Sequence, residues 1–527
     1  MKASKRPAAS PIETELKLAL PGAEMATLEQ RLARVPILTR REVTRREMHS
    51  VYYDTPDQNL HKLRVALRVR QIGTGKRARW RQILKLAGED ESALTSRGEW
   101  ESAVPAAALE WSLLQATPWL ELDADGALFR NLAPCFVTTF TRVSWLVRRR
   151  DRSVVEVSLD VGEIVAGEKR APICELELEL WAGEPKALFD IATAIARSIA
   201  VLPATFSKAE RGYALAQNRL NVPRATRPPA LTVRQPLSDA AARVLHEAFG
   251  QFITNLNMLR DADDAALVHQ ARVGWRRFKG AYRLFKPVFF ANAARDATVA
   301  KVIPPAPPWA LLEPLVAQLG ELRDLDVAGS ETLPVIADEY IADDPERKKN
   351  WQVLMQSFTH AAAARRHGLR ALLAMPDIGA ALLAFTEWLS HHPRAANSGD
   401  PVHGSGSSIA VARNAMPPLR DWAEHRVARL HKQLRAATKA AAFAHSNDAD
   451  EHRVRILAKR LRYGIEALHA LLAKNHRRDW HRLATDLQSH IGAKRDLVVA
   501  SQLAAKLAGD PGLAEFLRGL AVGINTR

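Results

Sequence analysis

The segment Glu13-Thr14-Glu15-Leu16-Lys17 decides the fold of the N-terminal part of this chain. It lies in a stretch from Ile12 to Leu20 whose alternation of charged and apolar residues predicts a β-strand. Side chains two residues apart on a strand point to the same face, so Glu13, Glu15 and Lys17 form one charged row. Such a row is either the solvated face of an ordinary sheet or the charged lining of a closed one.

Charged rows recur in later segments that also predict strands. They are Arg68 and Arg70; Glu99 and Glu101; Glu156, Ser158 and Asp160; and Glu175, Glu177 and Glu179. For any single strand the solvated face is the simpler interpretation, but some of these rows are acidic and others basic. If the strands close into a barrel, the rows face each other inside it, and ligands relieve the repulsion between like charges. Carboxylates bind hard divalent cations, and arginine or lysine binds phosphate oxygens, so a metal-bridged oligophosphate would satisfy both sets.

The distribution of strand, helix and proline signals predicts two domains. Further strands are predicted over Leu63 to Gln71, Ser153 to Val161 and Ile173 to Trp181, and helices over Ala23 to Val35 and Glu184 to Val201. Between Asn221 and Pro236, prolines stand among basic and small residues, which suits neither helix nor sheet, and the chain beyond is mostly helical in pattern. We therefore predict a strand-rich domain over 10–215, a proline-rich linker over 221–236 and an all-helical domain over 237–520.

The composition limits the partners and the compartment. The 527 residues are 47% apolar and 25% charged, and their net charge of +17 with a pI near 10.0 predicts a polyanionic partner: nucleic acid, an anionic membrane or a phosphate polymer. The two cysteines, Cys135 and Cys174, are too few for a disulfide framework. No apolar run reaches the roughly 18 residues of a membrane span. We expect a cytoplasmic protein with no membrane partner.

The charged rows stand in the order of motifs known from the CYTH family, the triphosphate tunnel metalloenzymes. The segment from Glu13 to Lys17 matches the ExExK signature of this family. The further matches are Tyr52-Tyr53-Asp54-Thr55, Arg68 and Arg70, Lys85, Glu99, Arg142, Asp160, the Glu175-to-Glu179 ladder and Lys208. Over residues 10–215 the chain therefore resembles the CYTH family. The resemblance implies an α+β fold class, with an eight-stranded antiparallel β tunnel preceding the all-helical domain.

The resemblance also implies roles for the matched side chains. Those that would bind the triphosphate are Lys17, Arg68, Arg70, Lys85, Arg142 and Lys208. Those that would hold Mg²⁺ or Mn²⁺ are Glu13, Glu15, Glu99, Asp160 and two of Glu175, Glu177 and Glu179, a choice that one sequence leaves open. Metal and guanidinium groups would neutralise charge on the transferring phosphoryl group while a water is oriented for attack. No side chain stands out as an obligatory general base, and no GxxxxGKS/T phosphate loop is present.

A basic stripe occurs twice in the helical part. The first series is His269, Arg272, Arg276, Lys279 and Arg283, whose members fall within an arc of about 80° on a helix. The second series has the same offsets in His452, Arg455, Lys459 and Arg462, but Glu466 replaces the last base. A similar run follows each series, Gly320 to Asp326 and Gly492 to Leu497. The pattern predicts an internal duplication whose stripes are either solvated faces or a surface for a polyanion.

Over residues 237–520 these series resemble the CHAD family, whose name stands for conserved histidine alpha-helical domain. The resemblance implies two four-helix bundles related by pseudo-twofold symmetry, with a basic groove that binds inorganic polyphosphate. The groove residues that it implies are His269, Arg272, Arg276, Lys279, Arg283, His452, Arg455, Lys459 and Arg462. Glu466 makes the two halves of the groove unequal. The stripes lack interleaved aromatic residues for base stacking and no DNA-reading motif is present, so we expect no specific nucleic acid partner.

The leading hypothesis is an inorganic triphosphatase that hydrolyses tripolyphosphate to pyrophosphate and phosphate, with the helical domain attached to long-chain polyphosphate. One alternative is a non-catalytic polyphosphate-binding or granule-associated protein whose tunnel only holds phosphate. Another keeps the tunnel but changes its chemistry to adenylate cyclisation or to hydrolysis of an organic triphosphate such as thiamine triphosphate. Intact acidic and basic sets favour the enzyme, and the CHAD-like domain favours the inorganic substrate.

Overall fold

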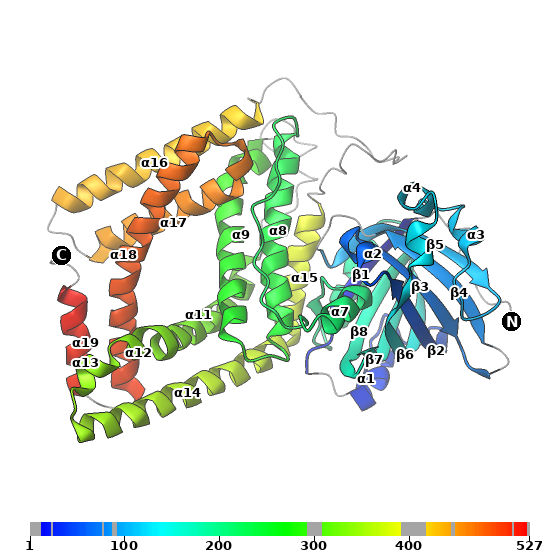
Figure 1. The fold of residues 1–527 in the computed structure, drawn as a ribbon, viewed down its shortest axis with the longest axis horizontal. Coiled ribbons are helices and arrows are strands. Elements are labelled where there is room, and N and C mark those ends of the chain that lie inside the picture. Colours follow the sequence, from blue (N-terminus) through cyan, green and yellow to red (C-terminus); the bar gives the residue numbers. More distant parts are fainter. Residues whose placement is uncertain are drawn as a thin grey trace.

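The computed structural model of the protein describes residues 12–22, 25–75, 78–86, 92–291, 308–391, 418–443, 448–507 and 511–523. Figure 1 shows a strand-rich N-terminal part beside a C-terminal part built of helices. The predicted fold class is confirmed, because a closed antiparallel barrel precedes a helical domain.

Eight strands close the barrel. They are β1 (Ile12–Ala19), β2 (Val43–Asp54), β3 (Val65–Ile72), β4 (Arg79–Leu86), β5 (Leu94–Val104), β6 (Ala133–Arg148), β7 (Val154–Ala166) and β8 (Lys169–Ala182). Neighbours pair in the order β5-β4-β3-β2-β6-β7-β8-β1, and β1 closes the ring by pairing with β5 between Ile12 and Leu16. A short strand, β9 (Leu202–Pro203), pairs with the end of β1. Closure separates an inner face from an outer one.

The outer face of the barrel carries the apolar residues of the alternating pattern. Leu16 of β1, Val157 of β7 and Leu176 of β8 are buried in one core with helices α1 (Met25–Ala33) and α6 (Lys186–Ala196). The other short helices here are α2 (Asn59–Lys62), α3 (Trp111–Leu114), α4 (Trp119–Leu122), α5 (Ala127–Arg130) and α7 (Lys208–Ala216). Because alternate residues point to opposite faces, this packing turns the charged rows inward.

The predicted strands are present, and two of them extend beyond their predicted ends. The strand predicted to end at Val161 continues to Ala166, and the one predicted to begin at Ile173 begins at Lys169. Gly167 makes the tight turn between them with a φ of 59°, a left-handed conformation that glycine adopts without steric cost. The hairpin is therefore longer than the alternation of charged residues indicated.

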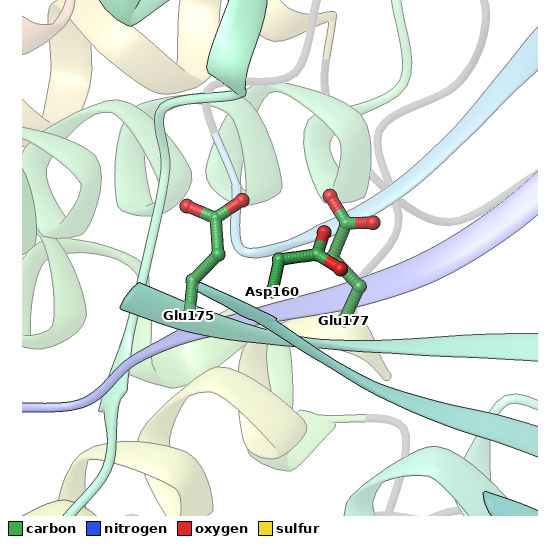
Figure 2. Close-up of side chains that lie close together, drawn as sticks. All are labelled: Asp160, Glu175 and Glu177. Atoms are coloured by element: carbon green, nitrogen blue, oxygen red, sulfur yellow. The ribbon is translucent and has the colours of Figure 1, made fainter. Parts of the chain in front are cut away.

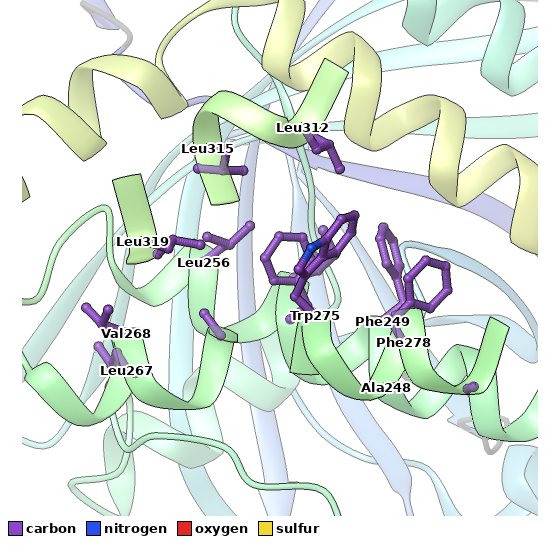
Figure 3. Packing of buried hydrophobic residues seen from close by; sticks show 14 of the residues in the cluster. Ala248, Phe249, Leu256, Leu267, Val268, Trp275, Phe278, Leu312, Leu315 and Leu319 are labelled. Atoms are coloured by element: carbon purple, nitrogen blue, oxygen red, sulfur yellow. The ribbon is translucent and has the colours of Figure 1, made fainter. Parts of the chain in front are cut away.

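The helical domain follows a segment, residues 217–236, that contains no helix or strand. Its helices are α8 (Leu237–Met258), α9 (Ala265–Ala291), η2 (Trp309–Leu312), α11 (Glu313–Val327), η3 (Ala328–Thr332), α12 (Leu333–Val335), α13 (Ala337–Ile341), α14 (Pro345–Leu373), α15 (Pro376–Ser390), α16 (Leu419–Phe443), α17 (Asp448–Ala467), η4 (His469–Leu471), α18 (Lys474–Leu507) and α19 (Pro511–Gly523). Figure 3 shows part of its core, where Phe249, Trp275 and Phe278 pack near Leu312 and Leu315. Burial of these large apolar side chains stabilises the packing of α8 and α9 against η2 and α11.

The duplicated basic series meet in space. They lie on α9 and α17, which contact each other, and the runs from Gly320 and Gly492 lie on α11 and α18, which are also in contact. Among the described residues no single helix is long and apolar enough to cross a membrane; α14 and α15 reach that length and composition together, but as a pair bent by 68°.

The two domains touch through α15, which packs on α6 of the barrel domain. Leu383 of α15 is 1% exposed and belongs to the same core as Leu188 and Ile191 of α6. At Gly379, an added Cβ would lie only 2.1 Å from the carbonyl oxygen of Val201. Glycine therefore allows α15 to approach the backbone of the barrel domain.

We predict that Gly379→Ala destabilises the protein, because the added methyl group meets a backbone carbonyl that cannot move away freely. The expected loss is on the order of 1–3 kcal/mol in the free energy of unfolding, as for other overpacked sites. Gly368→Ala in α14 is the matched control, since its Cβ would meet only Gln318 Oε1 at 3.7 Å. The control should be neutral or stabilise by up to about 1 kcal/mol. Thermal unfolding followed by circular dichroism measures both variants, and equal effects would contradict the close contact.

Candidate functional site

The barrel encloses a cavity of about 690 Å³. Its wall consists largely of inward residues of the strands, and the strand register sets opposite charges beside each other. Lys17 lies opposite Glu177, Lys85 opposite Glu99 and Arg142 opposite Asp160. Acidic and basic residues therefore face one another around the wall at short range.

Asp160, Glu175 and Glu177 converge at one point of the barrel, where Glu177 lines the cavity (Figure 2). One carboxylate oxygen of each lies within 4.8 Å of the other two. The Lys208 ammonium is 2.6 Å from Asp160, 2.5 Å from Glu175 and 2.9 Å from Glu177. Lys208 is the first residue of α7, and the Ser207 side chain caps that helix by accepting a hydrogen bond from its first turn. The cap fixes the point from which Lys208 enters the barrel.

Arg142 of β6 contacts the same acidic cluster. Its guanidinium donates to both carboxylate oxygens of Asp160, at 2.7 and 2.6 Å, and to Glu177. Burial alone would raise the pKa of Glu177, but Lys208 and Arg142 hold it well below its ordinary value. Glu177 therefore stays ionised at neutral pH although it is buried.

A second group of ion pairs surrounds the start of β1. The Lys85 ammonium is 2.6 Å from Glu13 and 3.1 Å from Glu99. Lys17 lies 2.6 Å from Glu15. Burial opposes the ionisation of Glu99, but Lys85 lowers its pKa to about 2. The carboxylates of the ExExK segment are thus neutralised by bases from neighbouring strands and from β1 itself.

Arg97 belongs to this second group, although the sequence analysis did not single it out. Its side chain is 3.4 Å from Glu13 and also donates a hydrogen bond to Glu15. The period of two that places Glu99 on the inner face also places Arg97 there, so the signal was present. Arg46 is a further unpredicted residue of the wall, and Glu101 and Glu156 of the predicted charged rows also line it, although no role was assigned to them.

Arg68 and Arg70 form a basic part of the wall. Arg68 donates to the Tyr52 hydroxyl at 2.7 Å, and Arg70 donates to the Ser50 hydroxyl at 3.0 Å. Both side chains are buried, and neither forms a salt bridge with a carboxylate in the described part of the chain. Burial, together with Arg68 and Arg142, lowers the pKa of Arg70 to about 10. Two buried guanidinium groups without a paired carboxylate attract an anion.

In the helical domain, α9 and α17 bring together four of the predicted groove residues, which we call the basic cluster: Arg272, Arg276, Arg455 and Lys459. Burial, together with Arg455 and Arg276, lowers the pKa of Lys459 to about 7. Burial and Arg276 likewise lower the pKa of Arg272 to about 10. Gly320 leaves room for Arg272, because an added Cβ would lie 2.7 Å from its guanidinium. Like charges are therefore crowded together at this point.

Two arginines of the repeated runs extend the basic cluster. Arg495 of α18 lies near Arg455, and Arg323 of α11 lies near His269, close enough in each pair to lower the pKa of the partner. The sequence analysis did not assign either arginine, although the repeated runs that contain them were its second sign of duplication. The repetition of these runs could have identified both arginines.

Other predicted groove residues lie outside the basic cluster. Lys279 lies over the ring of Trp309, 5.9 Å from its centroid, and Arg283 and His452 are exposed. Their predicted role in binding polyphosphate stays a prediction.

Arg462 also lies away from the basic cluster, next to Glu466. Its guanidinium lies 5.0 Å from the centroid of the Tyr463 ring and 3.6 Å from Glu466. Arg277 of α9 donates to the same carboxylate at 3.0 Å. Glu466 thus pairs with bases from both halves of the duplication, in the place where the first series has an arginine.

Family models match both parts of the chain. The CYTH domain model matches residues 11–213 and the CHAD domain model matches residues 243–505. The chain joins a CYTH domain to a CHAD domain. The domain limits expected from composition, 10–215 and 237–520, stay predictions.

Individual proteins are similar to one or the other part. The inorganic triphosphatase of Haemophilus influenzae is 35% identical over 208 residues, which are 38% of this chain and 54% of that protein, so the chain spans about half the length of this relative. The CHAD domain from the plant Ricinus communis is 25% identical and covers 58% of this chain and 92% of its own, with a TM-score of 0.44. HpAC1 from Hippeastrum, described as having a dominant triphosphatase activity, is 19% identical and covers 38% of this chain and 95% of its own, with a TM-score of 0.29.

The CYTH barrel gathers the predicted substrate and metal residues around one cavity. Those on its wall are Glu13, Lys17, Arg68, Arg70, Lys85, Glu99, Arg142, Glu177, Glu179 and Lys208. Glu15, Asp160 and Glu175 contact bases next to the wall. Of the three glutamates of β8, Glu175 and Glu177 join the acidic cluster with Asp160, whereas Glu179 lies opposite Glu15. The roles of all these residues stay predictions.

The acidic cluster fits the divalent metal on which CYTH triphosphatases depend. Asp160, Glu175 and Glu177 offer hard oxygen donors that lie close enough together to share one ion. Lys208 neutralises the same oxygens, so its ammonium and a metal ion would compete for them. A bound ion would release Lys208 to contact phosphate.

We predict that Lys208→Met lowers the thermal stability of the protein at neutral pH. The substitution leaves the three carboxylates of the cluster without the ammonium, and breaking a buried ion pair costs about 3–5 kcal/mol. The loss should shrink as the pH falls toward about 4, where the carboxylates take up protons. Added Mg²⁺ or Mn²⁺ should also restore stability, because the ion binds the same oxygens.

The control for this variant is Lys186→Met, which removes an exposed ion pair with Asp190. An exposed pair contributes at most about 1 kcal/mol, so this change should be small at every pH. Differential scanning calorimetry measures both variants. A loss at Lys208 that depends on neither pH nor metal would contradict the proposed competition.

Proposed function

We propose that the CYTH tunnel hydrolyses inorganic triphosphate to pyrophosphate and phosphate in a metal-dependent reaction. The observation that carries the proposal is the presence, in one cavity, of a basic wall without paired carboxylates beside an acidic cluster. Arg68 and Arg70 represent the first set, and Asp160, Glu175 and Glu177 the second. An oligophosphate with a divalent cation matches both sets. The similarity to the inorganic triphosphatase of Haemophilus influenzae supports the inorganic substrate.

Each set has its own part in this reaction. Arg68, Arg70 and Lys85 would bind phosphate oxygens, and their fixed positive charge would stabilise the charge that builds up on the leaving group. Asp160 and Glu177 belong to the set that would hold Mg²⁺ or Mn²⁺. When bound, the metal supplies Lewis-acid activation of the phosphate and orients the attacking water.

Two other functions compete for the same cavity. An organic triphosphate, such as ATP or thiamine triphosphate, is compatible with the volume, since 690 Å³ falls within the roughly 300–1,000 Å³ that are usual for small-molecule sites. A non-catalytic tunnel that only holds phosphate would need the basic wall but has no use for the acidic cluster. The acidic cluster therefore favours the metal-dependent enzyme.

We also propose that the CHAD domain binds long-chain polyphosphate at the basic cluster. Burial and crowding lower the pKa of Lys459 to about 7, so the cluster is a place where a polyanion relieves repulsion between bases. Neither a specific nucleic acid nor a membrane is a partner in this proposal. A cytoplasmic location, with association to polyphosphate granules as an alternative, agrees with two free cysteines.

The proposed reaction predicts a substrate preference and a division of roles between acids and bases. The full chain should release phosphate from tripolyphosphate with Mg²⁺ or Mn²⁺ but not with EDTA, and should act more slowly on ATP and thiamine triphosphate. Glu13→Gln or Glu15→Gln should reduce activity more than triphosphate affinity, because these carboxylates hold metal while the bases hold phosphate. Arg68→Ala or Lys85→Ala should weaken binding and turnover together, with a loss on the order of 10²-fold in kcat/KM.

Phosphate release and calorimetric titration measure these two effects separately. Equal loss of activity and affinity in the folded glutamate variants would contradict the division between metal-holding and phosphate-holding residues. Preference for ATP or thiamine triphosphate would favour the organic substrate, and complete inactivity with intact triphosphate binding would favour the non-catalytic tunnel.

The proposed binding of polyphosphate predicts the effect of removing the basic cluster. Changing all four residues of the basic cluster to alanine should abolish binding of long-chain polyphosphate and leave tripolyphosphate hydrolysis nearly intact, because the tunnel is a separate site. Counterion release should make binding by the parent protein fall steeply with salt, and each lost base should reduce the slope of log affinity against log salt by up to about one.

The matched control removes four exposed bases of α16 instead: Arg420, Arg429, Lys432 and Arg435. It changes the formal net charge by the same amount at a different place. Fluorescence titration with labelled polyphosphate compares the two variants. Similar losses in both would mean that net charge, not the basic cluster, determines binding.

A further inference from the structure

One end of the tunnel cavity is lined by residues that lie outside the barrel strands. Besides Arg64, which precedes β3, and residues of α2, of α7 and of the segment before α7, these are linker residues Arg219 and 222–225 and Met258, at the end of α8 in the CHAD domain. We call this end the linker mouth. It is built by both domains, because its wall contains the linker and a side chain of the CHAD domain.

The linker mouth carries three arginines, and Glu210 of α7 also lines the cavity near Arg224. Arg64, Arg219 and Arg224 all line it. Arg64 and Arg219 are exposed, and within the described residues neither forms a salt bridge. The Arg224 guanidinium lies over the ring of Phe206, 4.9 Å from its centroid, a contact that holds it beside the cavity. The positive charge of Arg68 and Arg70 inside the barrel is thus continued at the linker mouth.

Buried amides of α8 hold the linker at this place. Asn255, which is fully buried, accepts a hydrogen bond from the backbone N–H of Arg224 at 3.0 Å and donates one to its carbonyl at 2.9 Å. Gln251, also buried, accepts from the Thr226 hydroxyl at 2.8 Å, and Arg277 donates to the Thr226 carbonyl at 3.2 Å. A buried amide that loses its partner is costly, so the linker cannot shift without a penalty on α8.

We propose that the linker mouth is a phosphate subsite, which binds phosphoryl groups of a linear polyphosphate beyond the three held inside the barrel. Arg224 contacts the substrate there, and Asn255 is the positioning residue through which the CHAD domain sets the place of Arg224. The inference rests on the proposed triphosphatase function and deepens it, since it extends the substrate class to phosphate chains longer than three.

The side chains of the linker mouth favour a phosphate chain over the organic group of a triphosphate ester. Three arginines line it, and phosphate oxygens are the groups that arginines bind. An aromatic ring that stacked on Phe206 would have to displace the guanidinium of Arg224. The chemistry of the mouth is therefore that of an extended anion.

The test compares tripolyphosphate with tetrapolyphosphate on the full chain, with Mg²⁺ present. Arg224→Ala should raise the KM for tetrapolyphosphate about tenfold more than the KM for tripolyphosphate, the usual effect of losing one hydrogen bond to a charged group. Asn255→Ala should change the ratio of the two KM values, tetrapolyphosphate over tripolyphosphate, in the same direction. Asn257→Ala is the control, since it removes a contact between α8 and the Pro203 carbonyl at 2.9 Å without touching the linker, and it should leave the ratio unchanged.

Calorimetric affinities for the two phosphates, measured on the same proteins, separate this inference from the function on which it rests. Absence of tripolyphosphate hydrolysis by the parent chain would overturn the proposed function. The subsite would then be tested only by the ratio of the affinities for tetrapolyphosphate and tripolyphosphate, compared between the parent and the Arg224→Ala protein. If Arg224→Ala leaves this affinity ratio unchanged, the proposed subsite is wrong. The same conclusion would follow from an effect of Arg224→Ala on ATP or thiamine triphosphate that exceeds its effect on tetrapolyphosphate, because the mouth would then serve an organic group.

Discussion

Neutralisation of charge inside the closed barrel is the constraint on which the rest of the structure depends. Alternation and closure direct charged rows into an enclosed cavity of about 690 Å³, where an unpaired buried charge is costly. The strand register meets this constraint by setting acids beside bases, as at Lys17 and Glu177. Within the described chain, Arg68 and Arg70 stand outside this pairing. In the proposed function, the triphosphate would bind where the pairing of acids with bases along the wall stops.

The two domains treat their positive charge differently. In the CYTH barrel, carboxylates offset most of it, and the acidic cluster is paired with the Lys208 ammonium. In the CHAD domain, bases crowd against bases with Asp324 and Asp496 beside them, and Lys459 is about half protonated at neutral pH because its pKa is about 7. A bound polyanion would raise that pKa, so binding would take up protons from solution. The first site thus pairs its bases with acids, and the second would respond to pH.

Much of the fold was predictable because a period of two is a strong local signal. It placed Glu13, Glu15 and Lys17 on one face, and the helical period placed Arg272 and Arg276 together in the same way. The partners of these residues were not predictable from one sequence, since Arg97 meets Glu15 only after β1 and β5 close the ring. Likewise, the choice among the glutamates of β8 depends on where α7 delivers Lys208, and the linker becomes a wall of the tunnel only because α8 holds it. A helical spacing also could not show that Glu466 pairs with Arg277 of the other half of the duplication as well as with Arg462.

The burial of Leu383 from α15 in the outer core of the barrel has a consequence for how the protein is made. A ribosome completes the barrel well before it reaches α15, and at 5–20 residues per second the interval is on the order of 10–30 s. During that time the α6 surface on which Leu383 packs faces solvent on the nascent chain. A chaperone that shields apolar surface would bind this α6 surface. A truncated chain that ends between the two domains would leave the same surface exposed and prone to aggregation.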